Sequence, residues 1–305
     1  MKTFLRSLIT AGCIAGAIQL LTVGVLAPRL PRTMGRPVLE STRTLDLPPA
    51  ELFRLANRDG SVHVRTHSLP GIQVQTDIRA YAYETEAETA AERYVQSLLA
   101  VESSPGTVSV VTEPEDRPDA VDVQVDCTVL VPPGTDLEIE SANGNVWVAE
   151  DCGRVTVQGR NTDIEVVAPR GLVSAQSMNG RIRVLDAVAD TVIKTVNGNV
   201  YAHMKAGVLR ADTTNGAIVA HRLDRGCRDF ELRSQNGGIT LVMNQGDSVR
   251  VQADTERGVV KCDLPVDASS GLSERRRLHG VIGKGDTTLS MTTLNGNIWI
   301  ARAKT

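Results

Sequence analysis

Apolar and polar residues alternate along most of the chain, and a recurring Asn-Gly dipeptide organises the alternation. Asn-Gly or a variant of it occurs at eight positions, and the first five are spaced by 18 residues. These positions begin at Asn143, Asn161, Asn179, Asn197, Asn215, Asn236, Arg257 and Asn295. Thr162 replaces the glycine of the second unit, and Arg257 replaces the asparagine of the seventh. Such a fixed period indicates a repeat protein whose units stack on one another.

Each unit carries apolar residues six and four positions before the asparagine and three and five positions after it. In the first unit these residues are Leu137, Ile139, Val146 and Val148. Alternation with a period of two predicts two short strands per unit, each with one side facing inward. The Asn-Gly pair between them is predicted to supply a corner with positive φ. A small residue, usually Ser or Thr, lies two positions before the asparagine and could bond backbone groups of the corner.

Asn-Gly is also a strong signal for a two-residue β-hairpin, so two arrangements compete. The near identity of successive units favours stacking, in which each strand pairs with its counterpart one turn away. We therefore predict an all-β fold, a stacked β-solenoid of 18-residue, two-strand rungs over residues 132–305. Eight rungs about 4.8 Å apart would form a column about 40 Å tall.

Residues 42–131 precede the repeats and are predicted to form a strand–helix–strand portion that caps the solenoid. Phe53, Leu55, Asp59-Gly60, Val62 and Val64 follow the repeat pattern once. Further strands are expected at Ile72–Tyr83, Val108–Val111 and Val121–Val131, a helix at Glu84–Ala100, and an acidic loop at Glu113–Asp119. A cap is expected because an open sheet end invites pairing with other chains.

The N-terminus carries an uncharged run from Ser7 to Ala27, which is long enough to span a bilayer as a helix. Residues 1–27 are predicted to be an uncleaved signal anchor, and residues 28–41 a Pro-rich linker. A cleaved signal peptide and lipidation of Cys13 remain alternatives. All three interpretations place the chain in the membrane or export it across the membrane. We therefore expect a single-pass membrane protein with an extracytoplasmic β domain.

The net charge and the amino-acid composition of the chain exclude some classes of function. The chain has 33 Lys and Arg against 36 Asp and Glu, which excludes a basic protein that binds nucleic acid. Aromatic residues make up only 3% of the chain, which fits thin layers of small β-branched residues. The acidic residues are scattered, and no nucleophile lies in a recognisable catalytic motif. No catalytic residue, metal site or cofactor is therefore predicted.

Two segments carry a family resemblance. Residues 130–146 read LVPPGTDLEIESANGNV, and the chain ends with Gly283-Lys284-Gly285 and then Leu294-Asn295-Gly296-Asn297-Ile298. With the serial Asn-Gly units they resemble the bacterial "putative adhesin" family, also called toastrack, over residues 42–303. The resemblance implies an extracytoplasmic β-solenoid, often tethered to the membrane, and it brings no catalytic residues.

One outer face of the predicted solenoid is richer in aromatic residues than the other. Four positions after the asparagine lie Trp147, Arg183, Tyr201 and Trp299, and six positions after it lie His203 and His221. We predict these six as binding residues, because exposed apolar and aromatic surface is normally covered. Cover by residues 51–131 is the preferred interpretation, and an envelope protein or glycan is the other.

Histidine and cysteine residues offer further chemistry. His203 and His221 should lie about 5 Å apart on adjacent rungs, where they could share a metal or respond to pH, but a pair without a role is favoured. Cys127, Cys152, Cys227 and Cys262 follow the N-terminal run. Cys262 is expected to be a buried thiol, and a disulfide involving Cys127 or Cys227 stays open.

These observations favour a non-enzymatic, membrane-tethered binding or scaffold module of the bacterial envelope, similar to an adhesin. A polysaccharide-processing β-helix enzyme is the first alternative, although it would need a cluster of catalytic residues on one face. A self-assembling structural protein of the envelope is the second alternative.

Overall fold

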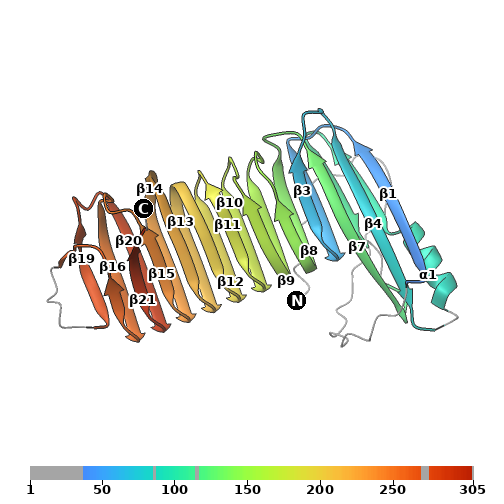
Figure 1. Ribbon diagram of the computed structural model, residues 1–305. Helices are drawn as coiled ribbons and strands as arrows, with labels where there is room; N and C mark the ends of the chain where they lie inside the picture. Colours follow the sequence, from blue (N-terminus) through green and yellow to red (C-terminus); the bar gives the residue numbers. More distant parts are fainter. Residues whose placement is uncertain (1–36, 85–86, 114–116, 269–274, 304–305) are drawn as a thin grey trace.

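The computed structural model describes residues 37–84, 87–113, 117–268 and 275–303, except for the side chain of Leu223. Within these ranges the chain forms one 21-stranded sheet and a single helix. The strands follow one another along an elongated column, with α1 at its N-terminal end (Figure 1). The predicted all-β class is confirmed.

The N-terminal portion contains eight elements. They are β1 (Leu39–Leu47), β2 (Leu52–Asp59), β3 (Val62–Thr66), β4 (Ile72–Ala82), α1 (Ala87–Gln96), β5 (Leu99–Ser104), β6 (Thr107–Thr112) and β7 (Val121–Val131). Strand β1 begins within the predicted linker, because residues 39–47 pair with β4 along their whole length. Helix α1 is shorter than predicted, because Leu99–Ser104 pairs with β6 as a strand instead of continuing the helix.

The repeats supply the remaining strands. They are β8 (Asp136–Val148), β9 (Val155–Val167), β10 (Val173–Asn179), β11 (Ile182–Ala187), β12 (Thr191–Asn197), β13 (Val200–Asn215), β14 (Ile218–Asn236), β15 (Ile239–Met243), β16 (Val249–Arg257), β17 (Val260–Cys262), β18 (Asp267–Ala268), β19 (Arg277–Ile282), β20 (Thr287–Asn295) and β21 (Ile298–Arg302). Strands β18 and β19 lie in the insertion between the seventh and eighth units.

The rungs stack in parallel, as the period predicted. Val146 pairs with Ile164, Ile164 with Ile182, and Ile182 with Val200, each in the same register. All four side chains are buried. Strands that precede the asparagines form one ladder and strands that follow them form a second ladder, which we call the first and second ladders. The hairpin interpretation of the Asn-Gly repeats is therefore wrong.

The rungs do not stack in chain order at the C-terminal end. Strand β20 pairs in parallel with β14 on one side and with β16 on the other. Strand β21 likewise lies between β15 and β17. The last unit of the chain, at Asn295, thus fills a gap between the units of Asn236 and Arg257, and the final strands of the chain lie inside the column (Figure 1).

Antiparallel strands close both ends of the column. At the N-terminal end, β4 pairs with β7 and β1 pairs with β4, while β5 covers the edge of β6. Helix α1 contacts β4 and β7 and buries Ala91, Tyr94 and Val95. At the other end, β19 pairs with β16, and β18 pairs with β19. The predicted capping role of the N-terminal portion is consistent with this arrangement.

The asparagines form a ladder of side-chain hydrogen bonds along one edge of the column. The amide Nδ2 of Asn197 donates to Oδ1 of Asn179 at 2.8 Å, and Nδ2 of Asn215 donates to Oδ1 of Asn197 at 2.8 Å. At the N-terminal end the ladder finishes on a carboxylate, where Asn143 donates to Asp59 at 2.6 Å. Stacked amides thus bond along the column.

Close packing, and not positive φ, explains the glycine at most corners. Among the Asn-Gly corners of the repeats, only Gly144 has positive φ. At Gly198 an added Cβ would lie 1.9 Å from the carbonyl oxygen of Gly180 on the preceding rung. The prediction of a left-handed corner is therefore wrong for most rungs, because successive corners stack too closely for any side chain.

The hydroxyl residues beside the corners also bond between rungs. Thr195 donates to the carbonyl oxygen of Gly180 at 3.2 Å, and Thr213 donates to that of Gly198 at 3.1 Å. The second unit reverses the two residue types, because it carries Gly159 before the corner and Thr162 in it. The hydroxyl of Thr162 donates to the carbonyl oxygen of Ser141 at 3.2 Å. The second rung thus still bonds to the preceding rung through a hydroxyl group.

The predicted signal anchor and most of the predicted linker lie outside the described residues. Among the residues that the structure describes, no helix is both long and apolar enough to cross a membrane.

Candidate binding face

The outer surface of the second ladder carries all six predicted binding residues. We call this surface the aromatic face and define it by the outward side chains at the fourth and sixth positions after each corner. In spatial order the fourth-position residues are His63, Trp147, Glu165, Arg183, Tyr201, Val219, Thr240, Trp299 and Lys261. Parallel pairing brings these side chains into one row, because counterparts on adjacent strands project in the same direction.

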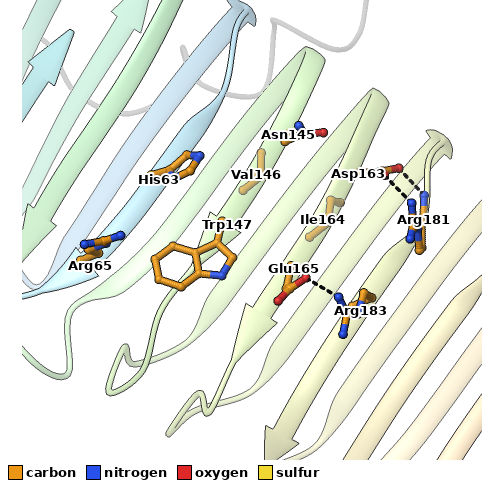
Figure 2. Close-up of a pocket in the computed structure, with 10 residues that line it drawn as sticks. All are labelled: His63, Arg65, Asn145, Val146, Trp147, Asp163, Ile164, Glu165, Arg181 and Arg183. Atoms are coloured by element: carbon orange, nitrogen blue, oxygen red, sulfur yellow. Dashed lines mark hydrogen bonds and ion pairs between the residues drawn. The ribbon is translucent and has the colours of Figure 1, made fainter. Parts of the chain in front are cut away.

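Trp147 lies at one end of this row in an open groove of about 420 Å³. Arg65 and His63 from β3 form one side of the groove, with the Arg65 guanidinium carbon 5.3 Å from the Trp147 ring centre. The His63 ring centre lies 6.0 Å from that of Trp147. On the opposite side, Figure 2 shows Glu165 directed towards Arg183. Aromatic and basic side chains thus converge around a half-buried indole.

Arg183 connects the groove with the middle of the face. Its Nη1 lies 3.0 Å from Oε2 of Glu165, and its guanidinium carbon lies 5.7 Å from the Tyr201 ring centre. Arg181 and Asp163 lie on the same two rungs, two residues nearer the corner. Nη2 of Arg181 lies 3.4 Å from Oδ2 of Asp163. Both carboxylates of this region are therefore neutralised by a neighbour one rung away.

Tyr201, His203 and His221 form one cluster. The Tyr201 hydroxyl and Nε2 of His203 are 2.8 Å apart, and the ring centres of the two histidines are 4.5 Å apart. The predicted stacking of these histidines on adjacent rungs is confirmed. Partial burial lowers the pKa of both imidazoles, and for His203 the charge of Asp186 opposes this shift.

Trp299 lies apart from the other predicted residues. Val219 on β14 and Thr240 on β15 separate it from Tyr201 along the row. Its indole Nε1 donates to Asp263 at 2.8 Å, and Nζ of Lys261 lies 5.1 Å from its ring centre. The side chain is 42% exposed. The structure thus brings together Arg183, Tyr201 and the two histidines, with Trp147 beside them and Trp299 at the far end.

The described residues of the N-terminal portion lie beside the aromatic face, and their contact with it is at Trp147, through Arg65 and His63 of β3. Strands β3 and β7 extend the second ladder sideways, because β3 pairs with β8 and β7 pairs with β3. The preferred interpretation, in which residues 51–131 cover this surface, is therefore wrong for the surface beyond Trp147. Strand β3 pairs through its backbone with the edge of β8, so it lies beside the outer face of β8 and not over it.

Sequence reasoning missed His63 and Arg65 as members of the face. The sequence does indicate that they belong to it. Asp59-Gly60 repeats the corner pattern, and His63 and Arg65 lie at the fourth and sixth positions after Asp59. Their position beside Trp147 depends on β3 pairing with β8, a contact between residues more than eighty positions apart.

The opposite face, formed by the outward side chains of the first ladder, is polar. Arg54 pairs with Glu138 at 2.6 Å, and Glu140 lies two residues further along β8. Partial burial, together with the charge of Glu138, raises the pKa of Glu140 to about 7. Gln176 and Lys194 are paired neighbours on this face and are exposed.

No disulfide joins any two of the four described cysteines, Cys127, Cys152, Cys227 and Cys262. Cys127, Cys152 and Cys227 are buried, whereas Cys262 is only partly buried. Burial raises the pKa of Cys127 and Cys152 to about 12. Within the described ranges, no group of three or more His, Cys, Asp or Glu side chains could hold a metal ion.

Comparison with known proteins identifies the family. The profile of the Toastrack DUF4097 family matches residues 101–301, and the chain belongs to this family, as the sequence resemblance predicted. No curated protein matches the chain.

Similar solved structures include one described as a "putative adhesin" from Bacteroides fragilis, with 12% identity, a TM-score of 0.49, and coverage of 86% of this chain and 97% of that chain. A second "putative adhesin", from Parabacteroides distasonis, has 7% identity, a TM-score of 0.44, and coverage of 86% and 97%. A "putative lipid binding protein" from Parabacteroides distasonis has 10% identity, a TM-score of 0.27, and coverage of 86% and 96%. Similarity at this level carries no argument about function.

Proposed function

We propose that this protein is a non-enzymatic binding module of the bacterial envelope that uses the aromatic face to bind an envelope glycan or protein. The observation that carries the proposal is a pair of aromatic and guanidinium clusters on one face: Arg65 lies over Trp147, and Arg183 contacts Tyr201, which contacts His221. Glu165 lies between the two clusters, and Trp147 and Arg183 line the same groove. Aromatic and Arg side chains supply much of the binding energy in known interfaces. Tethering by residues 1–27 and an extracytoplasmic location belong to the same proposal and rest on the uncharged N-terminal run.

Binding is favoured over polysaccharide processing by the state of the acidic residues. Cleavage of a glycosidic bond commonly needs two carboxyl groups that are free to act as acid, base or nucleophile. On the aromatic face Glu165 is paired with Arg183, and beside it in the groove Asp163 is paired with Arg181. Both carboxylates therefore serve as bonding groups between rungs, which suits a surface that holds a ligand without changing it.

A co-sedimentation experiment tests the proposal. The full chain is incubated with peptidoglycan sacculi and, separately, with envelope polysaccharide, and bound protein is measured as a function of concentration. We expect the double variant Trp147→Ala/Tyr201→Ala to bind at least about tenfold more weakly, because it removes two aromatic anchors.

The matched control is Gln176→Ala/Lys194→Ala, which truncates two exposed neighbours on the opposite face. It should bind like the unmodified chain. Equal binding by all three proteins, with unchanged thermal unfolding, would remove the aromatic face as the binding surface.

A further inference from the structure

We propose that the groove around Trp147 recognises an acidic sugar unit, with the sugar carboxylate on Arg65 and the sugar ring against the indole. The inference rests on the proposed function, because the groove is one end of the aromatic face. It adds a ligand class, which is a polysaccharide whose units carry carboxylate groups.

The charge of the groove is the first argument. Three guanidinium groups line it, and two of them are neutralised, since Arg181 pairs with Asp163 and Arg183 pairs with Glu165 (Figure 2). Arg65 is exposed and forms no ion pair with any described residue. The groove therefore carries one uncompensated guanidinium, which matches a single carboxylate in a bidentate geometry.

The position of Arg65 is the second argument. Its guanidinium lies over the Trp147 ring, with 5.3 Å between the guanidinium carbon and the ring centre. Stacking of this kind restricts the guanidinium while leaving its N–H groups at the edge free to donate. A ligand that contacts the indole will therefore meet a charged donor within the length of one sugar residue.

The remaining wall suits hydroxyl groups. Asn145, Asp163 and Glu165 also line the groove, and their side-chain oxygens can accept hydrogen bonds. The two carboxylates keep this acceptor capacity while their charge is balanced by arginine. A pyranose ring combines one apolar surface with several hydroxyl groups. In an acidic sugar the ring also carries a carboxylate, which is the anionic partner that Arg65 does not have among the described residues.

Calorimetric titration of the full chain tests the inference with a pair of matched ligands. The probes are oligogalacturonate and the same oligosaccharide with its carboxyl groups methyl-esterified, so that the two differ at the carboxyl groups and the ester carries no charge there. We expect the acidic form to bind at least about tenfold more tightly than the ester. Polyphosphate serves as a third probe, because it carries anions without a sugar ring.

Three variants assign the contributions. Arg65→Gln should abolish the preference for the acid over the ester, whereas Trp147→Ala should weaken both forms. Lys194→Gln is the control, since it removes one exposed positive charge from the opposite face. It should change neither affinity.

Several outcomes would overturn the inference. They are equal affinity for acid and ester, a preference that survives in Arg65→Gln, polyphosphate binding as tight as that of the acid, and no binding of oligogalacturonate at millimolar concentration. If the acid shows no advantage while Trp147→Ala/Tyr201→Ala still reduces binding to sacculi, the proposed function stands and only the ligand class is wrong.

Discussion

At the six corners that keep the Asn-Gly dipeptide, the glycine and the asparagine perform different tasks. The asparagine bonds its counterparts above and below, as Asn197 does with Asn179 and Asn215. The glycine allows the backbones to approach, since a Cβ at Gly198 would collide with the carbonyl oxygen of Gly180. The Asn-Gly dipeptide is thus explained by contacts between rungs, and the local turn conformation is secondary.

The substitution Gly198→Ala should strongly destabilise the protein. Its Cβ would meet a backbone atom at 1.9 Å, so two rungs must separate, and we expect a loss of about 3 kcal/mol in the free energy of unfolding. The control is Gly246→Ala, where the nearest atom is an arginine nitrogen at 3.8 Å. Urea unfolding of both variants measures the difference, and similar values would contradict the close-packing explanation.

Glu140 should make stability depend on pH. Burial and the nearby Glu138 raise its pKa from 4.5 to about 7 in the folded state. Between these values the folded state binds more protons than the unfolded state, so stability falls as pH rises. At pH above 7, Glu140→Gln should therefore be more stable than the unmodified chain by about 1 kcal/mol, a value reduced for solvent screening.

Urea unfolding at a series of pH values measures this effect. The advantage of Glu140→Gln should disappear below pH 4.5, where the carboxyl group is neutral in both states. Glu102→Gln, at an exposed position on β5, is the control and should have little effect. A constant difference between Glu140→Gln and the unmodified chain across the range would contradict the assignment.

At the scale of elements, the repeats are regular but their assembly is not. Strands β20 and β21 come last in the chain and yet pair on both sides. Ile298 and Ile300 of β21 are fully buried. Strands β20 and β21 thus lie between rungs formed by earlier parts of the chain. Both strands are part of the core.

A chain that ends at Asn297 should lose much of its stability. Without β21, strand β17 loses its only parallel partner among the described strands, and β15 loses one of its two. Burial of two Ile side chains contributes about 3 to 6 kcal/mol, so we expect a markedly lower melting temperature and early proteolysis. Trp299→Thr, which keeps the pairing, is the control. Unchanged melting of the truncated chain would show that β21 is dispensable.

At the scale of the molecule, the column is elongated and its ends differ. The N-terminal end finishes on β1 and β5, and the C-terminal end on β17 and β18, which have three residues and two residues. Strand β17 also donates from Val260 to the carbonyl oxygen of Arg275. Short and partly paired edges discourage strand addition, which argues against the self-assembling alternative.

The full chain should accordingly remain monomeric. Light scattering coupled to size-exclusion chromatography in detergent should give one molar mass, independent of protein concentration, after subtraction of the detergent. A mass that grows with concentration through a series of multiples would favour end-to-end assembly and contradict this expectation.

The repeat unit, its strands and the columns of its first five rungs could all be derived from the amino-acid sequence. The columns of Val146, Ile164, Ile182 and Val200, the register of these rungs and the shared outer face of Trp147, Arg183 and Tyr201 all depend on like pairing with like. Spacing along the chain is enough to assign such columns, because a strand alternates its sides with a strict period of two.

The neighbours at the two ends of the column are known from the fold and not from the period. The rungs present nearly equivalent edges, so local sequence does not distinguish a partner one unit away from a partner two units away. The place of the Asn295 unit between those of Asn236 and Arg257, and of β3 beside β8, depends on which edges remain open once the rest of the chain has paired. For the same reason, the meeting of Arg65 with Trp147 could not be derived from their spacing alone.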